Sequence, residues 1–143
     1  MNKQTMKTQD LLPASGACHC ARVQFEVMIE SQIVVQHCNC SICRMTGFVH
    51  LIVPGNRFRL VTGADQLTEY RFNSGVARHL FCSNCGVKSF YVPRSNPDGY
   101  SVNLLCLKLP DGVEVTEQQF DGKRWERNAL QLRHLSQTSK SDD

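Results

Sequence analysis

Cysteines carry most of the chemistry that this sequence can offer. Cys18 and Cys20 are separated by one residue, so an extended strand would turn both thiols to the same face. Cys82 and Cys85 are separated by two residues and followed by Gly86, a turn sequence that can bring two sulfurs to one ion. Together these four thiolates would form a closed tetrahedral set, which is typical of a structural zinc site.

A third cluster places Cys38, Cys40 and Cys43 within six residues. Three ligands from one loop can hold one zinc ion, and three protein ligands with an open fourth position are the pattern of catalytic sites. Zinc with three thiolates carries a charge of about −1, which suits chemistry on sulfur better than hydrolysis. We therefore expect an open zinc site that takes water, or a substrate thiol as its thiolate.

Other interpretations stay open at this point. The triple would be a closed structural site if it had a fourth ligand, for which the candidates are His37, His50, His79 and Cys106. Spacing does not decide whether Cys18 and Cys20 pair with Cys82 and Cys85 or with the triple. A redox role for Cys82 and Cys85 would require a βαβ setting, which this pattern lacks. Cys106 lies in an apolar run and is interpreted as a small core residue.

Short β-strands must position these clusters. Alternating or apolar runs predict strands over residues 23–29, 33–35, 48–53, 58–60, 67–72, 76–81, 90–92, 100–104 and 113–115. Residues 73–75 form a predicted turn, and at most one or two helical turns are expected after Cys40 or over residues 125–132. Many short strands with turn signals predict an all-β fold of short antiparallel strands, either a sandwich or a barrel-like sheet.

Length and charge narrow the function further. The chain has 143 residues, which predicts a single domain, here residues 15–135 between flexible ends at 1–14 and 136–143. A formal net charge of +3 is far below that of a dedicated nucleic-acid binder, so no nucleic acid is expected. We also expect no membrane span and no signal peptide, and therefore a reducing, cytoplasmic compartment where clustered cysteines bind metal.

The ordered motifs resemble those of the glutathione-dependent formaldehyde-activating enzyme family, which also includes centromere protein V. The matching residues are Gly16-Ala17-Cys18-His19-Cys20, Val23, Phe25, Cys38-Asn39-Cys40-Ser41-Ile42-Cys43-Arg44, Gly47, Gly63, Tyr70, Ser74-Gly75, Phe81-Cys82-Ser83-Asn84-Cys85-Gly86 and Phe120-Asp121-Gly122. Three ordered cysteine clusters make a specific match, which covers residues 15–126. One departure is Ala21, where the family usually has glycine.

The resemblance implies a zinc-stapled β-tent of the Mss4-like type with two zinc ions. Cys18, Cys20, Cys82 and Cys85 would match the structural site, and the triple would match the site that the family uses for catalysis. The implied activity is that of a carbon–sulfur lyase acting on S-(hydroxymethyl)glutathione-like adducts of a small aldehyde and a thiol. Glutathione would then be the co-substrate.

Glutathione carries two carboxylates, so its binding cleft should offer cations. Arg44, next to the triple, is the first candidate, followed by Arg78, Lys88 and Arg94. His50 and His79 are candidate proton carriers near neutral pH. The competing hypothesis is a non-enzymatic zinc-binding module that serves protein interaction or the buffering of thiols and zinc.

Overall fold

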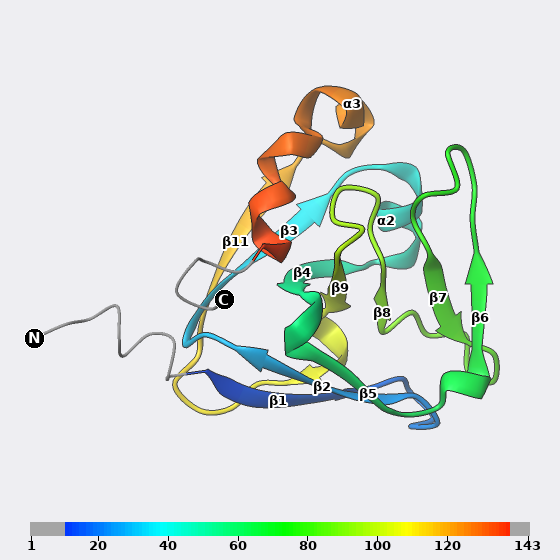
Figure 1. Cartoon of the computed structure of the whole chain (residues 1–143), viewed down its shortest axis with the longest axis vertical. Helices are drawn as coiled ribbons and strands as arrows, with labels where there is room; N and C mark the ends of the chain where they lie inside the picture. Colours follow the sequence, from blue (N-terminus) through cyan, green and yellow to red (C-terminus); the bar gives the residue numbers. More distant parts are fainter. Residues whose placement is uncertain (1–10, 138–143) are drawn as a thin grey trace, which may run out of the picture.

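Three small β-sheets form the body of the protein, whose computed structural model describes residues 11–137. The first sheet has the strand order β10-β1-β2-β5 and is antiparallel throughout. Its strands are β1 (Leu12–Ala17), β2 (Gln24–Ile29), β5 (Phe58–Thr62) and β10 (Leu107–Lys108). This sheet lies at the base of the molecule in Figure 1.

The second sheet rises from that base and has the order β11-β3-β4-β9-β8. Its strands are β3 (Gln32–Cys38), β4 (Val49–Pro54), β8 (Phe90–Tyr91), β9 (Gly99–Asn103) and β11 (Glu114–Phe120). Strand β11 runs parallel to β3, from Gln32 opposite Glu114 to Cys38 opposite Phe120. The helix α2 (Ser41–Thr46) connects β3 to β4, so the triple-cysteine segment lies at one end of this sheet.

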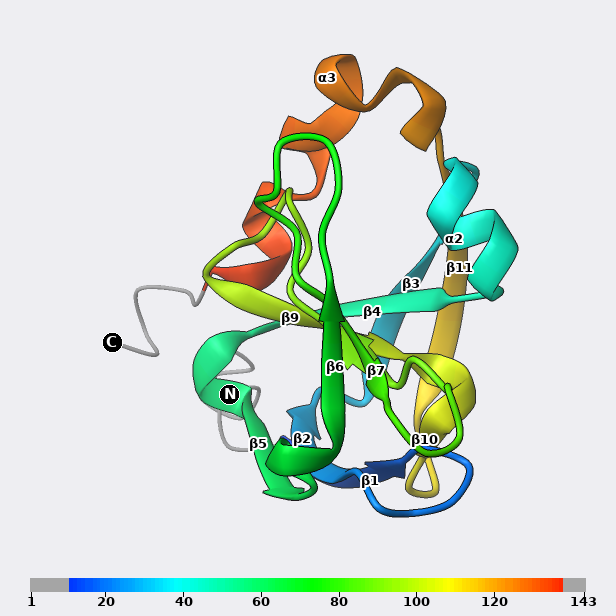
Figure 2. The ribbon, with the colours of Figure 1, turned by 90° about the vertical axis from the view of Figure 1, so that its right-hand side faces the viewer.

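The tip of a hairpin and the segments after β11 reach that same end (Figure 2). Strands β6 (Leu67–Tyr70) and β7 (His79–Cys82) form a separate two-stranded hairpin. After β11 come the short helical segments η4 (Gly122–Arg124), α3 (Trp125–Asn128), η5 (Ala129–Gln131) and η6 (Arg133–Ser136). Figure 2 shows α3, the tip of the hairpin and α2 at one end of the molecule, opposite β1 and β2. The short segments η1 (Gly55–Arg57), η2 (Ala64–Gln66) and η3 (Leu104–Cys106) connect strands that follow one another in the chain and belong to different sheets.

The core lies between the first two sheets and rests on alternation in β2. Phe25, Val27 and Ile29 are each at most 2 % exposed, whereas the residues between them face outward. Phe25 stacks on Phe58 with ring centroids 5.4 Å apart. A Cβ on Gly16 would lie 2.2 Å from the Phe25 ring, so the β1 position opposite this ring requires glycine.

The all-β class predicted from the sequence is confirmed, with two differences in detail. The pairing of β3 with β11 is parallel, although the strands were expected to be antiparallel. Strand β1 begins at Leu12 and buries Ala14, ahead of the expected domain start at residue 15, and Ser136 is buried beyond the expected end at 135. The outer parts of both expected flexible ends lie outside the described residues. In the described part of the chain, no helix is both long and apolar enough to cross a membrane.

Candidate functional site

The triple forms one compact group of sulfurs. The Sγ atoms of Cys38, Cys40 and Cys43 all lie within 4.8 Å of one another. Cys38 ends β3, Cys40 is the N-cap of α2, and Cys43 is buried inside that helix. The helix then closes at Gly47, whose left-handed φ of 66° suits glycine at a C-cap. A strand end and a single helical turn therefore aim three thiols at one point.

The segment after β11 clamps this loop from the other side. Asn39 donates a hydrogen bond to Asp121 at 3.1 Å and accepts one from the backbone N–H of Lys123 at 3.0 Å. Between them lies Gly122, where a Cβ would come within 2.3 Å of the Cys38 Sγ. Gly122, in the family motif at residues 120–122, thus has a structural role, because only a residue without a side chain leaves room for the Cys38 sulfur.

His50 supports the triple from β4. Its Nε2 lies 3.1 Å from the Cys43 Sγ, and its Nδ1 lies 2.9 Å from the Ser101 hydroxyl and 3.3 Å from the Tyr91 hydroxyl. Burial, with a smaller contribution from Lys88, lowers the pKa of His50 to about 3, so its ring is neutral. If one of these hydroxyls donates to Nδ1, the ring proton lies on Nε2 and can be donated to the sulfur.

The close approach of the three thiols also favours a thiolate. Hydrogen bonds from Cys38 and Cys43 lower the pKa of the Cys40 thiol far below its ordinary value. Its hydrogen bonds to Cys38 and Cys40, together with burial, raise the pKa of the Cys43 thiol. The thiolate is the form of cysteine that binds metal ions. The triple therefore contains at least one group ready for that role.

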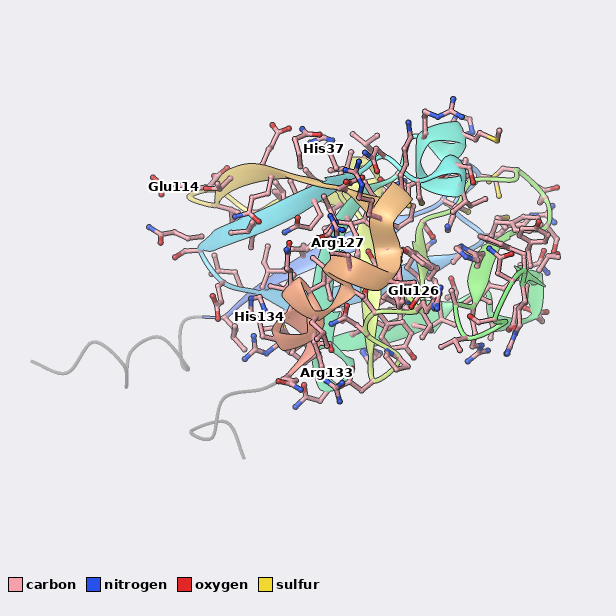
Figure 3. All side chains as sticks on the ribbon, turned by 90° about the horizontal axis from the view of Figure 1, so that it is seen from above. His37, Glu114, Glu126, Arg127, Arg133 and His134 are labelled. Carbon is pink, nitrogen blue, oxygen red and sulfur yellow. The ribbon has the colours of Figure 1, made fainter. Side chains whose placement is uncertain are left out.

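Among residues 11–137, no fourth cysteine, histidine, aspartate or glutamate joins this group of sulfurs. His50, one of the candidates, bonds only Cys43 of the three cysteines. His37 instead bonds Glu117 on β11 at 2.6 Å, and Figure 3 places it over β3 and β11. His79 and Cys106 are likewise outside the group. The geometry therefore favours three protein ligands over four.

The other four cysteines form a second group. The Sγ atoms of Cys18, Cys20, Cys82 and Cys85 lie within 4.8 Å of one another, which settles the open question of how the cysteine pairs combine. The group joins the end of β1 to the end of β7. Backbone N–H groups of Val23 and Asn84 each point at one of its sulfurs, at 3.4 Å.

Both groups have the donor chemistry of zinc sites. A tetrahedral ion with Zn–S distances of about 2.3 Å sets its sulfurs roughly 3.8 Å apart. Cys20 Sγ lies 3.7 Å from the Sγ atoms of both Cys18 and Cys82, close to that separation. All eight cysteines are free thiols, so no disulfide competes for these sulfurs. The residues present therefore fit a zinc ion in each group.

A cavity of about 550 Å³ opens over the triple, within the size range of small-molecule sites. Its walls come from the triple-cysteine loop, the β6–β7 hairpin, the loop after β8 and the α3 region. Arg44, Arg94 and Lys123 line it, whereas no aspartate or glutamate of the described residues does. The cavity is therefore suited to an anionic ligand.

Arg94 is held by two side-chain contacts. Its guanidinium lies 3.7 Å from the centroid of the Trp125 ring and bonds Glu126 at 2.5 Å. Figure 3 shows Glu126 on α3, seen from above the cavity end. One carboxylate partner leaves further N–H groups of Arg94 for a ligand, since a guanidinium has five.

The other expected cations lie elsewhere. Arg78 bonds Glu69 at 3.0 Å and does not line the cavity. Lys88 is buried, and its Nζ lies 2.7 Å from the Nδ1 of His79, a cavity-lining residue. Burial, and then the charge of Lys88, lower the pKa of His79 to about 4, so this histidine is also neutral.

Sequence reasoning missed several contributors to the site. Gly122 was recognised only as part of a motif, and Tyr91 and Ser101 gave no signal because strands commonly contain such residues. Cys106 lies outside both cysteine groups, as expected, but it is only half-buried and is not part of the hydrophobic core, in contrast to its interpretation as a core residue. Ala21 takes a left-handed φ of 67°, which explains why glycine is the usual residue there.

Comparison with known proteins now adds to this geometry. The model of the family described as glutathione-dependent formaldehyde-activating enzyme matches residues 13–123. The chain belongs to this family. A Halomonas elongata protein with the provisional name of glutathione-dependent formaldehyde-activating enzyme is 28% identical, over 74% of this chain and 83% of that protein. The match of the family model spans all seven clustered cysteines, as the resemblance predicted.

A solved structure supports the fold of this family member. A Rhodobacter sphaeroides protein, known from its crystal structure, is 34% identical to this chain. The match covers 73% of this chain and 99% of that protein, with a TM-score of 0.61. The structural match therefore extends over most of the glutathione-dependent formaldehyde-activating enzyme domain.

Proposed function

We propose that this protein is a zinc-dependent carbon–sulfur lyase that acts on adducts of a small aldehyde and a thiol, with S-(hydroxymethyl)glutathione as the expected type. One observation carries the proposal. A group of three cysteine sulfurs with no fourth protein ligand among the described residues faces a cavity lined by cations and by no carboxylate. Family membership supports the choice of glutathione and formaldehyde.

Cys38, Cys40 and Cys43 would hold the zinc ion of the reactive site. When bound, this ion would supply an open coordination position that accepts a thiol as its thiolate. With its proton on Nε2, His50 would donate to Cys43 and fix the direction of its sulfur, as residues behind a metal ligand commonly do. The second zinc ion would be structural, because Cys18, Cys20, Cys82 and Cys85 complete a four-sulfur set.

The cations at the cavity position the substrate. Arg94, in the loop after β8, contacts Trp125 of α3, Lys123 lies in η4, and Arg44 lies on α2 beside the triple. The two carboxylates of glutathione are well separated along the tripeptide, so they can pair with cations on both sides of the cavity. Its thiol would then reach toward the sulfurs of the triple. This role makes Arg44 and Arg94 binding residues rather than participants in bond breaking.

A cytoplasmic location agrees with this chemistry. All eight cysteines are free, and the proposed reaction requires a reduced thiol as co-substrate. Localisation by fractionation of cells that produce the protein tests this point, and enrichment outside the cytoplasmic fraction would contradict it.

NMR exchange spectroscopy tests the activity directly, because it measures the rate at which glutathione and formaldehyde interconvert with their adduct at equilibrium. We expect the zinc-loaded protein to accelerate this exchange above the spontaneous rate and Cys40→Ser to abolish the acceleration. Cys106→Ser is the matched control, since this cysteine lies outside both groups. A wild-type protein that binds zinc and glutathione without accelerating exchange would instead be a zinc-binding module.

A further inference from the structure

A buried lysine and a buried histidine form a pair at the wall of the cavity. The Lys88 Nζ lies 2.7 Å from the His79 Nδ1, and the two residues are 8 % and 5 % exposed. Neither residue belongs to a cysteine group, and the zinc chemistry described above does not use them. An ammonium group has only donors, so Nδ1 must accept this hydrogen bond.

The ring of His79 is held in place by two aromatic rings. Tyr91 stacks on it with centroids 4.9 Å apart and an interplanar angle of 11°, and Phe72 stacks at 5.2 Å. With Nδ1 bonded to Lys88, the ring cannot turn without losing these contacts. The orientation of the opposite ring edge, which carries Nε2, is therefore fixed as well.

That opposite edge meets the cavity. Among the described residues, every fully buried side-chain nitrogen or oxygen has a hydrogen-bond partner. No group within residues 11–137 bonds the Nε2 of His79, so this atom is not fully buried, and His79 lines the cavity over the triple. Because Nδ1 accepts from Lys88, the ring proton of a neutral His79 lies on Nε2.

The side chain and the backbone of Lys88 are both held in place. Its Nζ lies 3.9 Å from the centroid of the Tyr91 ring and 5.1 Å from that of Phe48, so aromatic faces surround the ammonium. Its backbone carbonyl accepts a hydrogen bond from Asn103 at 3.1 Å. No carboxylate of the described residues bonds its Nζ. The histidine is thus the principal hydrogen-bond partner that the fold offers this charge.

We propose that Lys88 is a positioning residue that holds His79 as the Nε2–H tautomer, and that His79 donates this hydrogen bond to the oxygen of the thiol–aldehyde adduct. The proposal rests on the proposed function for its substrate. It makes His79 a catalytic residue and gives Lys88 a role without contact to substrate.

The step balances without any further reactant. When the thiol sulfur attacks the carbonyl carbon, a C–S bond forms, the C=O π bond breaks and its electron pair moves to oxygen. The proton that the thiol loses then reaches that oxygen, which gives the hydroxymethyl thioether, and the lyase direction reverses each change. A fixed neutral donor stabilises the negative charge that builds up on oxygen in either direction.

Nitrogen NMR of the zinc-loaded, ¹⁵N-labelled protein tests the role of Lys88 independently of turnover. We expect the His79 ring to carry its proton on Nε2 in the wild type and to mix tautomers in Lys88→Met. Lys108→Met, which removes an exposed lysine from β10, should leave the His79 signals unchanged. A wild-type ring protonated on Nδ1 overturns the proposal even if Lys88→Met does not fold.

Exchange kinetics test the role of His79. Loss of one donor to a developing oxyanion lowers kcat by roughly 10²–10³-fold, so His79→Ala should show a loss of that order with glutathione binding retained. His79→Gln, whose amide nitrogen reaches the Nε2 position, should recover part of the rate. Full activity in His79→Ala overturns the proposal. A wild-type protein without exchange activity would contradict the proposed function. The His79 tautomer measured by nitrogen NMR would still test the role of Lys88 in that case.

Discussion

Gly122 offers a sharp test of how the triple is built, because its backbone angles suit any residue and only space is limiting. In Gly122→Ala the new Cβ would lie 2.3 Å from the Cys38 Sγ and 3.0 Å from the Cys40 Cβ. Ordinary contact requires at least about 3.4 Å, so the sulfur or the loop must move by about 1 Å. Metal–ligand distances tolerate only about 0.2 Å. We therefore expect the triple to lose its metal affinity by at least roughly tenfold.

Metal content after dialysis and the rate of zinc release to a chelator measure this loss. We expect Gly122→Ala to keep the zinc ion of the four-cysteine group and to lose the other. Gly47→Ala is the matched control, since its Cβ would meet nothing within 4 Å while its φ of 66° strains the helix end. That variant should lose about 1 kcal/mol of stability and keep both ions. Two ions with wild-type release rates in Gly122→Ala would refute the packing argument.

Three further predictions follow from single residues. Ala21→Gly should raise Tm by a few degrees in a thermal melt, because it removes a left-handed φ of 67° that costs about 1 kcal/mol; an unchanged or lower Tm would contradict this. Burial and Lys88 lower the pKa of His79 from 6.5 to about 4, so the unfolded chain binds more protons between these values and stability falls as pH drops through them. In urea unfolding at several pH values, His79→Gln should therefore lose less stability than the wild type when the pH is lowered. An equal loss in both proteins would contradict the lowered pKa of His79. Arg94→Ala should raise the KM for glutathione roughly tenfold, whereas Arg78→Ala, which loses only its two hydrogen bonds to Glu69 outside the cavity, should not.

The sequence predicted the parts of this protein whose signals are local. Alternation between apolar and polar residues located β2, and the spacing of the cysteines predicted the triple and each of the two cysteine pairs, but not which pairs combine. Helical turns were expected after Cys40 and around 125–132, where α2 and α3 lie. These features depend on neighbours within a few residues, which the sequence displays directly.

Features that depend on distant partners could not be predicted in this way. Nothing local tells β11 to pair in parallel with β3, since the partners are 82 residues apart, as in Gln32 and Glu114. The same pairing brings Gly122 against Cys38. Strand β1 was missed because proline, serine and glycine occupy half of its six positions.

The pair of Lys88 and His79 shows the same limit within the site. His79 was a candidate proton carrier and Lys88 a candidate cation for carboxylates, each judged alone. Their contact, at 2.7 Å, gives both a different role, because the lysine is directed at the histidine and the histidine at the cavity. Residue type indicated possible chemistry here, and only the packing of β7 against β8 selected among the possibilities.

The central claim is that the triple holds a metal ion with a position open to a thiol. Titration of the cobalt-substituted protein with glutathione tests it most directly, since cobalt–thiolate absorption reports each added sulfur ligand. We predict a saturable spectral change that is lost in Cys40→Ser and retained in Cys106→Ser. A spectrum that stays unchanged at millimolar glutathione would contradict the claim, because a closed site has no position to offer.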